Sequence, residues 1–130
     1  MNLTVIDPPR VFEVGRGERI QLKHHANIKL EADELITFVS ESGAEYDVTR
    51  KSWGFYATPS LNGRLRSFGL RAVLIKAPDG KFYIFLLEDG KEEEFQHYLS
   101  IEGHTILCWL DNDEALNTLE EKLKGREDAS

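Results

Sequence analysis

Apolar positions alternate with polar ones through the first half of the chain, and Gly, Pro, Asn and Asp interrupt them at short intervals. This period of two is typical of short antiparallel strands separated by turns. The pattern is clearest at Ile20, Leu22 and His24, which alternate with polar side chains and predict a strand with one face in water. The predicted strands span residues 11–14, 18–24, 28–30, 35–40, 45–48 and 52–57.

Two apolar runs in the second half predict a β-hairpin. Residues 70–76 and 81–88 contain many β-branched and aromatic side chains, and the tetrapeptide Ala77–Gly80 separates them. Its proline presets φ at the first central position of a turn and its glycine accepts a positive φ, so the tetrapeptide suits a tight connection. Because residues 82–87 are all apolar, we expect that strand to be covered on both faces and to lie in the centre of its sheet.

A helix is predicted after this hairpin. Asp89 is placed to cap its N-terminus with Glu92 as the reciprocal partner, and the glutamates at 92–94 suit the positive end of the helix dipole. Gly103 is placed to end the helix, and residues 104–110 return as a strand. Strand, helix and strand in this order form a β-α-β unit, whose two strands are expected to run parallel with a right-handed crossover.

A second helix follows, and the stretch after it is expected to fray. Asp111 and Glu114 repeat the capping pattern, leucines at 116, 119 and 123 form one apolar stripe, and Gly125 is expected to end the helix. The predicted fold class is therefore α+β, a single domain over residues 1–125. It has a mixed, mostly antiparallel sheet and a C-terminal β-hairpin-α-β-α segment that packs two helices on one face. Residues 126–130 are the frayed tail.

Composition agrees with one folded domain. Of the 130 residues, 41% are hydrophobic, 30% charged and 10% aromatic, which is too apolar for a disordered chain. A single cysteine excludes an internal disulfide framework. Neither a leader peptide nor an apolar run of about 18 residues is visible, so we expect a cytoplasmic protein that does not enter the membrane. The net charge of -7 argues against binding to nucleic acid or to an anionic membrane.

The charge is unevenly distributed along the chain. Between residues 50 and 78 there are six Lys or Arg side chains and no Asp or Glu, so this segment carries +6 and the remainder -13. Within it, residues 51–69 combine aromatic rings, hydroxyls and an Asn-Gly turn with arginines, and their Pro and Gly positions predict a loop. Loops held by a rigid scaffold are where binding groups concentrate. We refer to this stretch and its flanking arginines as the basic loop.

The basic loop suits a small anionic ligand. Guanidinium groups match phosphate or carboxylate oxygens, hydroxyl and loop N–H groups complete an anion shell, and an aromatic plane can cover a base or a sugar. The predicted ligand class is therefore a sugar phosphate or a nucleotide-linked sugar. The alternative is structural, with the arginines paired to the acidic surplus and the aromatic rings in the core. The candidate binding residues are Arg50, Trp53, Tyr56, Thr58, Ser60, Asn62, Arg64, Arg66 and Arg71.

Other residues with useful chemistry are isolated in the sequence. His24 and His25 are adjacent on a predicted strand, so their side chains point to opposite faces and cannot both reach one metal ion. Cys108 lies in an apolar strand without a basic neighbour, which is typical of an inert thiol. No catalytic residue, metal site or cofactor is assigned from the sequence.

Three segments resemble a family of small uncharacterised bacterial proteins. They are Trp53–Lys76, Gly90–Phe95 and Cys108–Asp111, and the resemblance covers residues 51–111. That family is associated with surface-polysaccharide and nucleotide-sugar biosynthesis, so the resemblance implies a phosphorylated or nucleotide-linked sugar as ligand. It supplies no catalytic residues to transfer and leaves the N-terminal strands unassigned.

Three functions follow as alternatives. The first is a small binding or accessory protein without turnover, which recognises an anionic ligand or an acidic surface of a partner protein through the basic loop. The second is a small enzyme acting on a sugar nucleotide, with His24 or His25 as general base and Tyr56 as acid. The third is a protein-interaction module, such as a homodimer, that uses an exposed sheet edge or a hairpin. The sequence favours the first over an enzymatic role.

Overall fold

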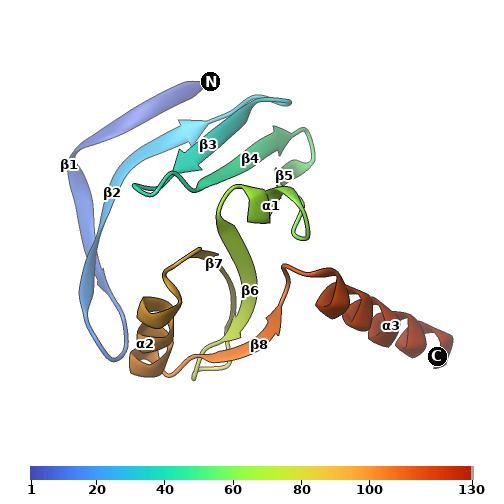
Figure 1. Ribbon diagram of the computed structural model, residues 1–130. Helices are drawn as coiled ribbons and strands as arrows, with labels where there is room; N and C mark the ends of the chain where they lie inside the picture. The colour runs from blue at the N-terminus through green and yellow to red at the C-terminus, as the bar shows by residue number, and fades with distance from the viewer. Residues whose placement is uncertain (130) are drawn as a thin grey trace.

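The strands of the computed structural model, which describes residues 1–129, form three antiparallel sheets (Figure 1). Together with three helices in the described chain, they make a single α+β domain that is mostly sheet, which confirms the predicted fold class. Within the described residues every strand pairs in the antiparallel sense. The sheet that was expected to be continuous and mixed is therefore divided into three antiparallel parts.

The first sheet is a long hairpin of β1 (Asn2–Val14) and β2 (Ile20–Lys29). The strands expected at 11–14, 18–24 and 28–30 are parts of these two longer ones. Two consecutive prolines interrupt the ladder within β1, because proline has no N–H to donate. No residue of either strand is fully buried, so the hairpin has no core of its own.

The second sheet has the order β3 (Leu35–Val39), β4 (Glu45–Lys51) and β5 (Gly54–Ala57). These strands agree with the prediction to within a few residues. The loop that follows contains one helical turn, α1 (Arg64–Ser67), which the hydrophobic pattern did not predict. Leu65 in this turn is only 1% exposed, so α1 anchors the basic loop to the core.

The third sheet has the order β7 (Phe82–Glu88), β6 (Leu70–Lys76) and β8 (Thr105–Trp109). The predicted hairpin of β6 and β7 is confirmed. The prediction that the strand at 82–87 is central is wrong, because β6 takes that place and β7 lies at the edge. Phe82 and Ile84 remain 58% and 54% exposed, so the apolar run marks an edge strand with part of its outer face uncovered.

β7 and β8 run parallel to each other because both pair antiparallel with β6. Helix α2 (Glu92–Glu102) connects them and packs against β7 through Phe85 and Phe95. The parallel direction expected of the β-α-β unit is therefore confirmed, although β6 separates the two strands. Gly103 ends α2 in the left-handed conformation at φ 70°, as predicted. The predicted cap at Asp89 is wrong, because no side chain caps the start of α2.

Helix α3 (Asp113–Ala129) extends away from the third sheet (Figure 1), in contrast to the expected packing of two helices on one face. Its N-terminal cap is Asn112, whose Oδ1 accepts an N–H of the first turn at 2.8 Å, and not the predicted Asp111. The helix also continues past Gly125. Of the tail expected to fray, Ser130 lies outside the described residues. None of the described helices combines the length and apolar content needed to cross a membrane.

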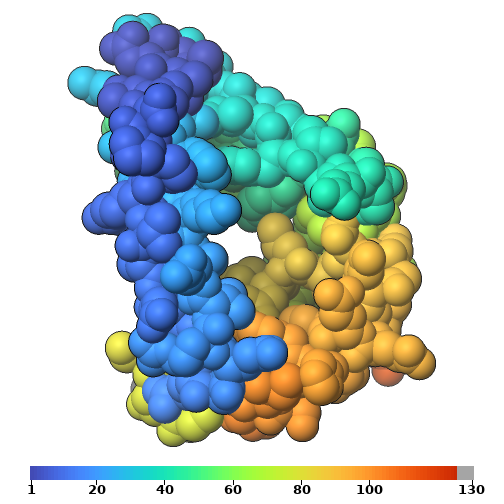
Figure 2. All heavy atoms as spheres, turned by 90° about the vertical axis from the view of Figure 1, so that its left-hand side faces the viewer, coloured from blue at the N-terminus to red at the C-terminus, as the bar shows by residue number. Residues whose placement is uncertain are grey.

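The core lies on both faces of β6. Ala72, Val73 and Ile75 are 0% exposed. On one face β6 packs against Leu65 of α1, and on the other it packs against Leu99 of α2. The β1–β2 hairpin stands apart from this core, and an opening separates the hairpin from the β7–α2 region (Figure 2).

Candidate functional site

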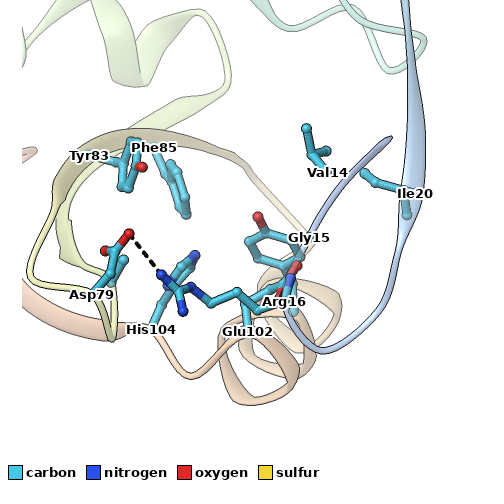
Figure 3. A pocket seen from close by; sticks show the side chains of 11 residues that line it. Val14, Gly15, Arg16, Ile20, Asp79, Tyr83, Phe85, Glu102 and His104 are labelled. Atoms are coloured by element: carbon cyan, nitrogen blue, oxygen red, sulfur yellow. Dashed lines mark hydrogen bonds and ion pairs between the residues drawn. The ribbon is translucent and has the colours of Figure 1, made fainter. Parts of the chain in front are cut away.

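The tip of the β1–β2 hairpin closes a pocket against the third sheet (Figure 3). The loop at residues 15–19 reaches the C-terminal end of α2 and the turn between β6 and β7. The cavity has a volume of about 340 Å³, near the lower end of the range for small-ligand sites. Its polar and aromatic lining residues are Arg16, Asp79, Tyr83, Phe85, Tyr98, Glu102 and His104.

Glu102 holds the hairpin tip from the last turn of α2. Its Oε2 accepts the backbone N–H groups of Arg16 at 2.7 Å and of Gly17 at 2.8 Å. These two bonds hold the pKa of the Glu102 carboxyl below its usual value. The residue is 6% exposed, so the carboxylate replaces lost water contacts with backbone donors. Only glycine fits at position 17, because a Cβ there would lie 2.1 Å from the carbonyl oxygen of Ile101.

An ion pair attaches the same hairpin tip to the β6–β7 turn. Arg16 Nη2 lies 2.8 Å from Oδ2 of Asp79 in the β6–β7 turn, as the dashed line in Figure 3 shows. The N–H of Lys81 donates to Asp79 and is the main cause that lowers the pKa of this carboxyl, with Arg16 adding to it. The loop of the hairpin is thus fixed to α2 by Glu102 and to the sheet by Asp79.

His104 lies among aromatic rings, next to the contacts that Glu102 and Asp79 make with the hairpin tip. Its ring centroid is 5.8 Å from Phe85, 5.9 Å from Tyr98 and 6.5 Å from Tyr83. Its Nδ1 is buried and has no hydrogen-bond partner in the described part of the chain. Burial, and then the charge of Glu102, raise the pKa of the Tyr98 hydroxyl, so this tyrosine is neutral near pH 7.

The lining groups without a hydrogen-bond or ion-pair partner in the described chain are aromatic faces, tyrosine hydroxyls and one buried imidazole nitrogen. Arg16, Asp79 and Glu102 already have partners inside the chain. Such walls suit noncovalent binding of a ring with polar substituents, because aromatic faces pack on rings and buried nitrogens need a hydrogen bond. Among residues 1–129, no three His, Cys, Asp or Glu side chains gather closely enough to hold a metal ion.

Three of the predicted binding arginines lie elsewhere and pair with buried aspartates. Arg66 Nη1 and Arg71 Nε both contact Oδ2 of Asp111, at 3.0 and 2.6 Å. Arg64 Nη2 lies 3.3 Å from Oδ2 of Asp47. Burial tends to raise the pKa of Asp111, but the bond from Arg71 and the nearby positive charges hold it below its usual value. The structural alternative therefore describes these arginines, and ligand binding at the basic loop stays a prediction.

Arg50, Trp53 and Tyr56 lie together on the β4–β5 hairpin. The Trp53 side chain is 70% exposed and stacks on Tyr56 with ring centroids 6.3 Å apart. Arg50 Nη1 donates to the carbonyl oxygen of Gly54 at 3.2 Å, and its guanidinium lies 5.3 Å from the ring centre of Phe55. The expectation that such rings belong to the core does not hold for Trp53.

The hydroxyl and amide groups of the basic loop have local partners. Thr58 Oγ1 lies 2.6 Å from Oγ1 of Thr49, and Asn62 Nδ2 donates to Oδ1 of Asp113 at 2.6 Å. Ser60 Oγ accepts the N–H of the first residue of α1 at 3.0 Å. The structure therefore joins Arg66 with Arg71, and Trp53 with Tyr56. It does not gather all nine candidate residues into one site.

The histidine pair considered as a general base lies in the first sheet. Nε2 of His24 is 3.1 Å from the carbonyl oxygen of Ala26 on the same strand. Tyr56, the proposed acid, belongs to the second sheet. Within residues 1–129 no hydrogen bond joins either His24 or His25 to Tyr56. The enzymatic alternative therefore has no supporting contact.

Sequence reasoning missed Arg16, Asp79, Glu102 and His104 as parts of a site. Arg16 and Glu102 are 86 residues apart in sequence, and local periodicity carries no information about such contacts. The one available signal is the pair of glycines that flank Arg16, because glycines in a hairpin loop also mark close approach to another backbone.

Comparison with known proteins assigns no family to the chain. No family model, characterised protein or solved structure matches the chain. The resemblance described from the sequence, and the sugar chemistry that it implies, stay predictions.

Proposed function

We propose that this protein is an interaction module that works as a subunit of a homo-oligomer. One observation carries the proposal, namely that the chain exposes 9405 Å² of surface. A folded monomer of 14.9 kDa is expected to expose about 7,000 Å². The difference of about 2,400 Å² per chain is comparable to what one subunit buries in a large obligate interface.

Much of the exposed surface on the hairpin is apolar. Leu3, Val5, Phe12, Ile20 and Leu22 are between 41% and 65% exposed. Antiparallel sheets normally cover one face with a core, and a two-stranded hairpin is at best marginally stable in water. Apolar side chains that adjoin one another on a surface mark interaction sites. The hairpin therefore supports a role in which another protein surface covers it.

The distribution of paired charges favours a second copy of the chain over an acidic partner protein. Arg64, Arg66 and Arg71 of the positive segment already pair with aspartates of the same chain, which leaves less charge to recruit an acidic surface. Uncovered apolar side chains lie on the hairpin, on the second and third sheets and on α3. Surfaces of this kind on one chain can cover each other in a closed symmetric assembly.

Sedimentation velocity of the full chain, from low to high micromolar concentration, tests the proposal. We expect a species whose mass is a multiple of 14.9 kDa and which persists on dilution. A monomer at every concentration would contradict the proposal, because the apolar surface would then be stable in water without a second copy.

The aromatic pocket favours a second candidate function, the binding of a small ligand with a sugar or base ring. The buried and unpartnered Nδ1 of His104 supports it, since buried polar atoms in folded proteins normally have a partner. A thermal-shift assay with UDP-glucose and glucose 1-phosphate tests it. We expect stabilisation that His104→Phe abolishes and that Arg64→Ala with Arg66→Ala preserves. The reverse result would assign the ligand to the basic loop, and no stabilisation would remove this candidate.

A further inference from the structure

Helix α3 extends away from the rest of the domain (Figure 1). Much of its apolar side is uncovered. Leu116, Leu119 and Leu123 share one side of the helix because they are spaced by three and four residues. Leu119 is 38% exposed and Leu123 55%. Isolated helices of about 15 residues are only marginally stable in water, so α3 needs packing against this stripe.

A groove of about 400 Å³ lies between α3 and β8. Leu107 and Cys108 line it from the strand, and Ala115 and Leu119 line it from the helix. Leu107 is 46% exposed. Of the leucine stripe, Leu119 therefore lies in the wall of an open groove whose floor is apolar and whose rim carries polar side chains such as Thr118 and Lys122.

The groove is continuous with an uncovered part of the third sheet, which we call the outer face and define by Leu74, Phe82, Ile84 and Cys108. Leu74 lies directly opposite Ile84 in β7 and Cys108 in β8, so the three side chains share one face. Phe82 is two residues before Ile84 on the same strand and points the same way. This face needs a cover that its own chain does not provide within residues 1–129, since Phe82 is 58% exposed.

We propose that α3 of a second copy lies in this groove, so that two chains exchange their C-terminal helices around a two-fold axis. This inference rests on the proposed function and names the surface that joins the copies. In a two-fold contact the same surface occurs on both partners. One arrangement therefore covers the leucine stripe and the outer face of both chains at once.

The charges along α3 favour an antiparallel pair of helices. Asp113 and Glu114 lie in its first turn, and Lys122 and Lys124 follow later in the helix. Glu114 and Lys122 both border the groove. Two antiparallel copies that cross near the middle of the groove place Lys122 of each helix beside Glu114 of the other, whereas parallel copies in register would place like residues together. A second copy thus matches the groove in charge as well as in apolarity.

The available area is sufficient for such a dimer. A stable interface removes about 800 Å² from each partner. The chain exposes about 2,400 Å² more than a monomer of its mass is expected to expose. Burial of α3 and the outer face fits within this excess.

Leu123→Glu tests the inference, with Leu35→Glu on β3 as its matched control. The two leucines are 55% and 49% exposed, and neither contributes to the core, so both variants are expected to keep the fold, which circular dichroism checks. In sedimentation velocity we expect Leu123→Glu to raise the dissociation constant of the dimer at least about thirtyfold. We expect Leu35→Glu to change it by less than about threefold.

The outcomes separate this inference from the function on which it rests. A monomeric parent protein contradicts both. A parent oligomer that Leu123→Glu leaves intact contradicts the α3 exchange and keeps the proposed function. Dissociation by Leu35→Glu alone would place the interface on the second sheet and overturn the inference.

A charge reversal gives a second and independent test. Glu114→Lys is expected to weaken the dimer, because it places lysines of the two copies side by side. Adding Lys122→Glu to that variant is expected to restore it, because the opposite charges then face each other again. No loss from the first change, or no recovery from the second, would contradict the antiparallel arrangement. The rate of maleimide labelling at Cys108 in the groove is expected to rise whenever the dimer dissociates.

Discussion

The β1–β2 hairpin and the β6–β7–β8 sheet are both antiparallel and rich in apolar side chains, yet they are stabilised in different ways. In β6, Ala72, Val73 and Ile75 are 0% exposed, because the strand has a neighbour at each edge and a helix on each face. In β1 and β2 no residue is fully buried. The hairpin tip is attached by polar contacts instead, through Glu102 and through the pair of Arg16 and Asp79.

An apolar stripe therefore specifies that a surface must be covered, but it does not specify which segment covers it. The third sheet obtains its cover from α1 and α2 of the same chain. The hairpin and the outer face keep exposed apolar side chains, and the proposed function supplies their cover from a second copy. Three substitutions test how far the two regions really differ.

The largest expected effect lies in the core of the third sheet. Ile75→Ala should lower the free energy of unfolding by about 2–5 kcal/mol, because it removes buried contacts and leaves a cavity. Ile20→Ala in the hairpin, where the side chain is 48% exposed, should lower it by less than about 1 kcal/mol. Urea unfolding measures both. Similar losses in the two variants would contradict this difference, since they would show that the hairpin is as well packed as the sheet.

A smaller effect is expected at the ion pairs that join the basic loop to the third sheet. Asp111→Asn should lower the free energy of unfolding by about 2 kcal/mol, because the carboxylate accepts charged hydrogen bonds from Arg71 and Arg66 and its side chain is 3% exposed. Asp33→Asn is the control, because Asp33 is also paired, with Lys51, but its side chain is 71% exposed. That control should lie within about 0.5 kcal/mol of the parent.

The pH dependence of the Asp111→Asn variant tests whether the carboxylate causes this loss of stability. The pKa of Asp111 is held below its usual value, so its carboxylate stabilises the fold fully above about pH 4. The stabilisation is lost as the pH falls through the lower pKa of the folded state. The parent and Asp111→Asn are therefore expected to converge in acid. A difference that persists unchanged in strong acid would exclude the carboxylate as its cause.

The smallest effect on unfolding is expected at the hairpin tip. Glu102→Gln removes the charge that holds two backbone N–H groups, which should release the tip while the core stays intact. Hydrogen–deuterium exchange should accelerate at residues 15–19 and remain slow in β6. Glu18→Gln, an exposed change beside the same loop, is the control. Unchanged exchange at the tip in Glu102→Gln would show that other contacts hold the hairpin.

The elements of the third sheet were predictable because their signals are local. The turn at Ala77–Gly80 and the left-handed Gly103 follow from the backbone preferences of proline and glycine. The edge position of β7 was not predictable, because an apolar run has the same appearance whether its cover comes from its own chain or from another. The charge of the basic loop was visible as well. The partners of its arginines were not, since Arg66 and Asp111 are 45 residues apart.

Local sequence signals are sufficient for the α+β class, most strands, the β6–β7 hairpin and the end of α2, because turn residues and hydrophobic period act over a few neighbouring positions. Local signals do not specify which faces are covered, which aspartates pair with the arginines, or that the hairpin tip at Arg16 contacts Glu102 and Asp79. These outcomes depend on close packing between segments far apart in sequence. Such contacts depend on complementary shape and charge between the two segments, and the local periodicity of either segment does not record them.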